Sequence, residues 1–275
     1  MELPIFVTVF IIIFAVLAFL FAFYLFLMAP KKTKDMEKYK GLYYAHRGLH
    51  NSERAENSMS AFRAAVEAGY GIELDVRLSK DGKLVVFHDD TLDRVCGREG
   101  KVIDFTAEEL ATFSLSGTSD GIPLFTDVLS LVDGKIPLLV EIKENPSDSS
   151  VSTTTCEILK NYHGDYIVES FNPISLKVVK KMLPDVSRGI LCQQYMKCKN
   201  LKKPLYFFMQ MLVGNFACRP AFIAFYHEHW RSGALRIARA LFKVPTIAWT
   251  VKSPEDEMLA RKHGFDGIIF ENYLP

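Results

Sequence analysis

The chain has 275 residues, 49% of them hydrophobic, and its 33 basic and 32 acidic side chains leave a formal net charge of +1. This balance argues against a nucleic-acid-binding surface, so we expect no nucleic-acid partner. The five cysteines are an odd number without CxxC spacing, which argues against a disulfide framework and a zinc site and fits a reducing compartment.

The N-terminal segment is apolar without interruption. Residues 4–28 contain no charged side chain, and roughly 20 such residues suffice to cross a bilayer core as a helix. A cleaved secretory signal is the competing interpretation, but its basic start is missing and the run is too long for its apolar region. We therefore predict a transmembrane anchor over residues 1–30, a basic juxtamembrane linker over 31–41 and one folded domain over 42–275.

The linker sets the expected topology. It carries five lysines, namely Lys31, Lys32, Lys34, Lys38 and Lys40. Lysines beside a membrane span stay on the cytoplasmic side and attract anionic headgroups. We predict a single-pass protein of the cell membrane with an outside N-terminus and a cytoplasmic body; its oligomeric state does not follow from the sequence.

From residue 42 onward, short β-rich runs alternate with helical patterns, which is typical of βα units around a parallel sheet. The predicted strands are residues 42–46, 71–76, 137–143, 166–171, 188–192, 221–225, 246–251 and 267–270. Eight such units predict an α/β fold of the TIM (β/α)8 barrel class. A doubly wound open sheet is the alternative, although its glycine-rich fingerprint is missing.

Two local patterns refine this prediction. The helix that follows the first strand begins with Asn57 as its predicted N-cap and ends at Gly69 as its predicted C-cap. The run at 84–89 comes too soon after the second strand for a parallel crossover, so we predict a hairpin turning at Asp81-Gly82. With a two-residue turn, Asp75 would face His88, and residues 77–122 would form a small insertion above the barrel after strand 2.

Charged side chains gather where the predicted strands end. They are His46 and Arg47, Glu73 and Asp75, and Glu141 and Lys143, and the hairpin adds His88. Residues two apart on a strand point to the same side, so the three carboxylates are expected to share one mouth of the barrel. Ordinary rim charges are the plain alternative, but oxygen ligands of this kind suit one hard divalent cation, Ca2+ or Mg2+.

The remaining groups suit a phosphate ester. Arg47 and Lys143 beside a divalent cation describe a site for an anion with several oxygens. His46 and His88 titrate near working pH, so one could deprotonate a nucleophile while the other protonates a leaving oxygen. The pattern predicts phosphoryl-transfer chemistry.

Together these residues carry a family resemblance. The stretches "AHRG", "ENSMSAF", "GIELDVRLSKDGKLVVFHDDTLDR", "LLVEIK", "SFNP" and "AWTV" resemble the glycerophosphodiester phosphodiesterase family, in its membrane-anchored bacterial form, over residues 42–271. The resemblance implies a barrel with one divalent cation and hydrolysis of glycerophosphodiesters to glycerol 3-phosphate and an alcohol. It implies metal ligands Glu73, Asp75 and Glu141, an acid-base pair His46 and His88, and phosphate contacts from Arg47 and Lys143.

The sequence departs from the family at two places. The usual Pro-Glu-Asn reads Ala55-Glu56-Asn57; we expect Asn57 to keep its cap and Glu56 to orient Arg47, with a plain surface charge as the alternative. Where the family has Thr-Asp after its last strand, this chain has "FENY". Here Glu271 and Asn272 are expected either to support the site from behind or to have lost that contact.

Three further features can each be interpreted as structural or as functional. Trp249 belongs to the pocket wall or is simple packing. His227 and His229 are read as surface histidines in preference to a second metal site. The apolar run at 204–216 is read as a barrel helix packed on the sheet, with a surface that dips into the headgroup layer as the alternative.

Two other functions fit the same residues. A lysophospholipase D would act on membrane lysophospholipids, for which tethering raises the local substrate concentration. A catalytically silent membrane protein would only bind phosphorylated headgroups, but it would have no need of both histidines with the full carboxylate set.

Overall fold

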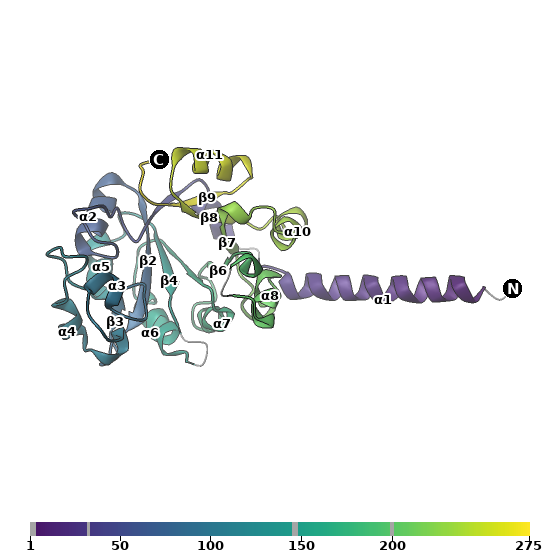
Figure 1. The fold of residues 1–275 in the computed structure, drawn as a ribbon, viewed down its shortest axis with the longest axis horizontal. Helices are drawn as coiled ribbons and strands as arrows, with labels where there is room; N and C mark the ends of the chain where they lie inside the picture. The colour runs from purple at the N-terminus through teal and green to yellow at the C-terminus, as the bar shows by residue number, and fades with distance from the viewer. Residues whose placement is uncertain (1–3, 32–33, 145–147, 199–200) are drawn as a thin grey trace.

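A long N-terminal helix leads into a closed barrel of parallel strands that helices surround (Figure 1). The computed structural model describes residues 4–31, 34–144, 148–198 and 201–275. The barrel strands are β1 Tyr43–His46, β2 Gly71–Leu78, β4 Leu138–Ile142, β5 Tyr166–Ser170, β6 Arg188–Cys192, β7 Phe222–Tyr226, β8 Thr246–Val251 and β9 Gly267–Phe270. Strand β1 pairs in parallel with both β2 and β9, which closes the ring. The predicted TIM barrel is confirmed.

The helices follow the predicted βα alternation. They are α2 Met59–Ala68, α5 Phe125–Val132, α6 Ser150–Leu159, α7 Pro173–Met182, α8 Pro204–Gln210, α9 Asn215–Cys218, α10 Gly233–Phe242 and α11 Pro254–Lys262. Two short helices, α8 and α9, fill the place between β6 and β7. The expectation that the apolar run packs as a barrel helix holds only in part for α8: Tyr206 and Met209 contact the barrel core, but none of its residues is fully buried.

The N-terminal end of the barrel is filled with apolar side chains. Tyr44, Leu139 and Phe222 belong to a buried cluster inside the ring. The short helix η1 Lys34–Tyr39 contributes Met36 and Tyr39 to the same cluster, so the segment before β1 covers this end. Polar groups at the strand ends therefore gather at the opposite, C-terminal mouth, as barrel geometry requires.

Helix α1 Ile5–Met28 projects away from the barrel and ends beside it (Figure 1). Its mean hydropathy over an 18-residue window is 3.2 and none of that window is buried in the protein. By length and composition it is the one helix in the described part of the chain that fits a membrane span. An apolar helix without a protein partner is otherwise costly in water.

The predicted hairpin is present, with a different turn. Strand β3 Leu84–Val86 pairs antiparallel with β2, and Val76 lies opposite Val86. The five residues 79–83 form the turn, so Asp75 lies opposite Phe87, whose N–H donates to the Asp75 carbonyl at 2.9 Å. The expected direct pairing of Asp75 with His88 is therefore wrong by one position, since an odd, longer turn shifts the register.

Residues after β3 build a small core of their own. The short helices α3 Asp93–Cys96, η2 Val102–Asp104 and α4 Ala107–Ala111 follow in order. Val85, Phe87, Leu110 and Phe113 are buried together in a cluster separate from the barrel cores. Because Phe87 belongs to this cluster, the segment that carries His88 is fixed by packing.

The start of α2 differs from the prediction. Ser58 is the N-cap, because its Oγ accepts from the Ala61 N–H at 3.2 Å. Asn57 stands one residue earlier with a left-handed φ of 53° and donates its side-chain amide to Asp75 instead. The expected C-cap at Gly69 is confirmed, with φ 75°.

Replacing Ser58 tests this assignment. Because the N-cap hydroxyl satisfies the otherwise unpaired N–H of the first helix turn, Ser58→Ala should lower the free energy of unfolding by about 1 kcal/mol. Denaturant unfolding of the full chain in detergent micelles measures the change. Ser130→Ala removes an exposed hydroxyl that bonds only within its own helix and should change stability little; an equal loss in both variants would contradict the cap.

Candidate active site

Three buried carboxylates meet at the C-terminal mouth of the barrel. Glu73 and Asp75 point to the same side of β2, and the register places Asp75 opposite Glu141 on β4. Each side chain offers an oxygen within 4.8 Å of the other two, and all three are buried. The expected convergence of these carboxylates is therefore present.

Two cations and an amide face these carboxylates. The Lys143 ammonium lies 2.7 Å from Glu141 Oε1 and 3.2 Å from Asp75 Oδ1. Arg47 Nε lies 3.5 Å from Asp75 Oδ2, which also accepts from Asn57 Nδ2 at 2.9 Å. Burial alone would raise the pKa of Asp75, but Lys143, His88 and Arg47 outweigh it and hold that pKa well below its usual range.

The other two carboxylates are less well compensated. Burial, followed by repulsion from Asp75, raises the pKa of Glu73 well above its usual value. Burial also raises the pKa of Glu141, although Lys143 opposes the shift. A buried group of three acids that two side-chain cations only partly neutralise fits a hard divalent cation, which takes oxygen ligands and favours their charged form.

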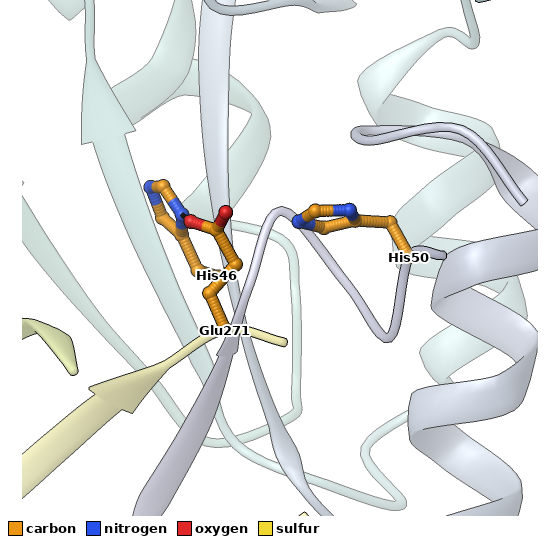
Figure 2. Close-up of side chains that lie close together, drawn as sticks. All are labelled: His46, His50 and Glu271. Carbon is orange, nitrogen blue, oxygen red and sulfur yellow. Dashed lines mark hydrogen bonds and ion pairs between the residues drawn. The ribbon is translucent and has the colours of Figure 1, made fainter. Parts of the chain in front are cut away.

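His46 pairs with a carboxylate from the end of the barrel. Its Nδ1 lies 2.7 Å from Glu271 Oε2 (Figure 2). Its Nε2 lies 3.9 Å from Glu73 Oε2. Burial lowers the pKa of His46, while Glu271 partly offsets that shift. Despite its own burial, the pKa of Glu271 falls to about 2 because it bonds His46. Glu271 thus supports the site from behind.

His50 lies on the other side of the same carboxylate (Figure 2). One ligand atom from each of His46, His50 and Glu271 lies within 4.8 Å of the others. A hydrogen bond or ion pair of 2.7 Å joins His46 and Glu271, so the closeness of these two groups does not by itself require a metal ion. Asn272 also donates to Glu271 Oε1 at 3.3 Å, so both residues of the departure from Thr-Asp take part.

His88 has a carboxylate partner as well. Its Nδ1 lies 2.6 Å from Asp89 Oδ1, and burial lowers the pKa of the imidazole. Arg94 donates to Asp89 at 2.6 Å and to both oxygens of Glu56 at 2.7 and 2.8 Å. Glu56 in turn accepts from Arg47 at 2.7 Å. This chain of charged groups ties the segment after β3 to the end of β1.

The His-Arg-Gly turn has its own steric reason. Arg47 and Gly48 both have positive φ, 56° and 83°. A Cβ on Gly48 would stand 3.0 Å from Ala61 and Phe62 of α2, so only glycine allows this approach. The turn directs the Arg47 N–H toward Glu73 Oε2 at 3.1 Å.

A hollow of about 320 Å³ opens beside these groups. Glu141, Lys143, Arg77 and Phe171 line it. Trp249 is not among the residues that line this hollow; its ring packs edge-on against Phe171 at 5.5 Å between centroids. Trp249 therefore supports the wall through Phe171.

The histidines after β7 are arranged differently from the expectation. His227 is buried, so the prediction of a surface histidine is wrong there. His229 accepts from the Gln194 N–H at 3.1 Å through Nδ1. Within the described ranges, neither belongs to a group with the spacing of a metal site.

Sequence reasoning missed three residues of this site. Asp89 and Arg94 form the pairs described above. Glu169 on β5 lies in register with Glu141, is 1% exposed, and burial raises its pKa well above the usual value. For Glu169 the sequence offered a signal, an acidic residue inside the apolar run "YIVESF". For Arg94 it offered no signal, because the contact with Glu56 joins segments far apart in sequence.

Comparison with known proteins shows the family to which this chain belongs. Residues 46–273 match the glycerophosphoryl diester phosphodiesterase family, and the chain belongs to it. The family consists of phosphoric diester hydrolases, which makes this protein an enzyme of that class.

Individual relatives agree with this membership. A glycerophosphodiester phosphodiesterase from Caldanaerobacter subterraneus subsp. tengcongensis is 35% identical over 244 residues, which cover 85% of this chain and 95% of the relative. A glycerophosphodiester phosphodiesterase structure from Thermotoga maritima superposes with a TM-score of 0.65 at 28% identity, over 83% of this chain and 93% of that one. An Oleispira antarctica phosphodiesterase, solved with its product sn-glycerol-3-phosphate, gives a TM-score of 0.70 over 85% and 94% of the two chains; at 19% identity it supports the fold alone.

The contact between His46 and Glu271 can be tested directly. Because Glu271 offsets the effect of burial, Glu271→Gln should lower the pKa of His46 further, so the imidazole stays neutral to more acidic pH. NMR titration of labelled histidines measures this shift. Glu255→Gln changes an exposed acid on α11 and should leave His46 unchanged; an unchanged His46 titration in Glu271→Gln would contradict the assigned pairing.

Proposed function

We propose that this protein hydrolyses glycerophosphodiesters to glycerol 3-phosphate and an alcohol, using one divalent cation and the pair His46 and His88. The observation that carries the proposal is the convergence of three acids, two histidines and two cations at one barrel mouth. The activities named for its relatives are consistent with this substrate class. Lysophospholipids contain the same phosphodiester and serve as comparison substrates.

Glu73, Asp75 and Glu141 would hold the cation, Ca2+ or Mg2+. Their donor set is all oxygen and buried, as such ions prefer. When bound, the cation supplies a positive charge that polarises a non-bridging phosphoryl oxygen. Asn57 keeps one Asp75 oxygen oriented, and the N–H of Arg47 does the same for Glu73.

Arg47 and Lys143 would contact the phosphate. Both ammonium and guanidinium groups are already held at the carboxylates by ion pairs, so little ordering is needed when substrate binds. Fixed charges aimed at the phosphoryl oxygens stabilise the charge that develops in the transition state. Glu56 limits the freedom of Arg47 in this role.

His46 and His88 would move the protons. Each imidazole has its Nδ1 against a carboxylate, which leaves Nε2 available to the substrate. One takes a proton from the nucleophile, either water or the glycerol 2-hydroxyl, while the other donates a proton to the leaving alcohol oxygen. In the second case water then opens the cyclic phosphate to give glycerol 3-phosphate. Burial lowers the pKa of both imidazoles, which suits the one that accepts a proton. The one that donates must start protonated, a form that the carboxylate at its Nδ1 favours.

Location follows from α1, which we propose spans the cell membrane with the barrel on the cytoplasmic side. The lysines after the helix and the absence of charge within it support this orientation. The residue ranges 1–30, 31–41 and 42–275 would then be anchor, linker and enzyme domain, with 77–122 as an insertion at the mouth.

Removal of an imidazole tests the acid-base pair. His88→Ala should lower kcat for glycerophosphocholine by about 10²- to 10⁴-fold, because one proton transfer loses its catalyst. His163→Ala removes an exposed histidine outside the site and should leave kcat unchanged. Products are identified by mass in detergent-solubilised full-length protein. Normal turnover in His88→Ala would show that the pair is wrongly assigned.

Metal binding should depend on pH. Since burial raises the pKa of Glu73 and Glu141, binding must displace protons, and affinity should rise from mildly acidic to mildly alkaline pH. Calorimetry with Ca2+ and with Mg2+ in buffers of different ionisation enthalpy measures affinity and proton release. Glu141→Gln should weaken binding, whereas Glu157→Gln, exposed on α6, should not.

A chelator provides the matching activity test. Hydrolysis of glycerophosphocholine by the unmodified chain should stop after chelation and return when Ca2+ or Mg2+ is added back. Full activity in chelator would remove the metal role of the three carboxylates.

A further inference from the structure

A patch of large apolar side chains is exposed on α8 and α9. Leu205, Phe207, Phe208 and Phe216 keep 66%, 46%, 54% and 54% of their surface exposed. These residues lie on two short helices that follow one another in sequence, and exposed large apolar side chains in this number are typical of an interaction site. We call these four residues the α8 patch.

The end of α1 is bonded to the same part of the barrel. Asn215 of α9 donates to the Met28 carbonyl at 3.0 Å. Arg219 donates to the carbonyls of Phe26 and Ala29 at 2.7 and 3.1 Å. In addition, the Lys31 N–H donates to the Pro220 carbonyl at 2.9 Å. These bonds fix the direction of the barrel relative to the helix.

The length of α1 leaves no spacer between a bilayer and this region. Residues Ile5–Phe23 are not buried by protein and measure about 28 Å at 1.5 Å per residue, which matches a hydrocarbon core of about 30 Å. Tyr24 and Leu25, which follow, are already half-buried against the barrel. Groups bonded to the last turn of α1 therefore lie at headgroup depth.

The α8 patch is part of that region. Only residues 211–214 separate α8 from α9, whose Asn215 bonds Met28. Helix α9 contacts α1, and in the view of Figure 1 the segment after β3 lies on the other side of the barrel from α8.

The charge of this region suits an anionic surface. Between Asp185 and Glu228 the sequence has six basic residues and no acidic one. Lys197, Lys202 and Lys203 are exposed close to the patch in sequence. Lysines beside exposed aromatic side chains are typical of segments that lie in the plane of a membrane interface.

We propose that the α8 patch inserts into the headgroup layer of an anionic bilayer, on the side where α1 ends. The proposal rests on α1 spanning the membrane. The barrel is then held at the lipid surface at two places, the anchor and the patch. Its direction relative to the membrane is fixed instead of varying about a flexible tether.

The patch connects inward to the wall of the active site. Met209 of α8 and Phe171 line the same small pocket, together with Tyr195. The Phe171 ring also lines the hollow at the carboxylates, and its centroid lies 5.8 Å from Lys143 Nζ. Insertion of the patch would thus place this wall near lipid.

Tryptophan quenching by lipid tests the insertion. The full chain is placed in nanodiscs of phosphatidylcholine and phosphatidylglycerol that contain a lipid with a nitroxide near the headgroup. Phe208→Trp should be quenched about three-fold more than Ile103→Trp, an equally exposed apolar position in the segment after β3. Emission of the unmodified chain, which contains Trp230 and Trp249, is subtracted.

Additional tryptophan positions and quenchers show whether a lack of quenching at position 208 comes from the span or from the patch. Phe14→Trp reports on the span with a nitroxide deeper in the acyl chain; without quenching there, both the span and the proposal fail. Quenching at position 14 with equal quenching at 208 and 103 would overturn the patch alone. Protection of position 208 from aqueous acrylamide without lipid quenching would indicate a second protein copy and also overturn it.

The charged part has its own control. Omitting phosphatidylglycerol, or replacing Lys197, Lys202 and Lys203 with Gln, should reduce quenching at position 208 and leave position 14 unchanged. Unchanged quenching at 208 in both cases would exclude a role for anionic headgroups. Hydrolysis of soluble glycerophosphocholine should persist in the Phe208→Trp chain. Lipid quenching at position 208 without any hydrolysis by the unmodified chain would contradict the proposed function and leave the patch standing.

Discussion

The arrangement of this protein depends on burying three carboxylates at one end of a barrel. Burial raises the pKa of Glu73 and Glu141, while Lys143 and Arg47 hold Asp75 in its charged form. Charged carboxylates repel one another strongly where water is excluded, so the barrel mouth favours the binding of positive charge. In the function proposed above, a divalent cation would offset the charge of the acids, and the two basic side chains would contact the phosphate ester.

The histidines gain their positions from partners outside the carboxylate group. Glu271 reaches His46 from the last strand, and Asp89 holds His88 beside the hairpin. Arg94 then joins Asp89 to Glu56 and so to the end of the first strand. Such contacts restrict the rotamers of both imidazoles before substrate arrives, which is how a site reaches productive geometry at low entropic cost.

The anchor and the barrel form one arrangement. Hydrogen bonds from Asn215 and Arg219 satisfy carbonyls at the end of α1 that have no partner within the helix. If α1 spans a membrane as proposed, these bonds would hold the barrel in one direction relative to the bilayer.

Local patterns in the sequence were enough to predict the barrel, the long apolar helix and the acids, histidines and basic side chains at the strand ends, because strand alternation and strand-end positions are local. It assigned the α2 cap to Asn57 instead of Ser58 and shortened the hairpin turn, since both depend on single-residue backbone geometry. The partners of the histidines and the exposure of α8 could be read only from the folded chain. Those outcomes depend on which distant segments meet, as when Arg94 reaches Glu56 and α9 bonds the end of α1.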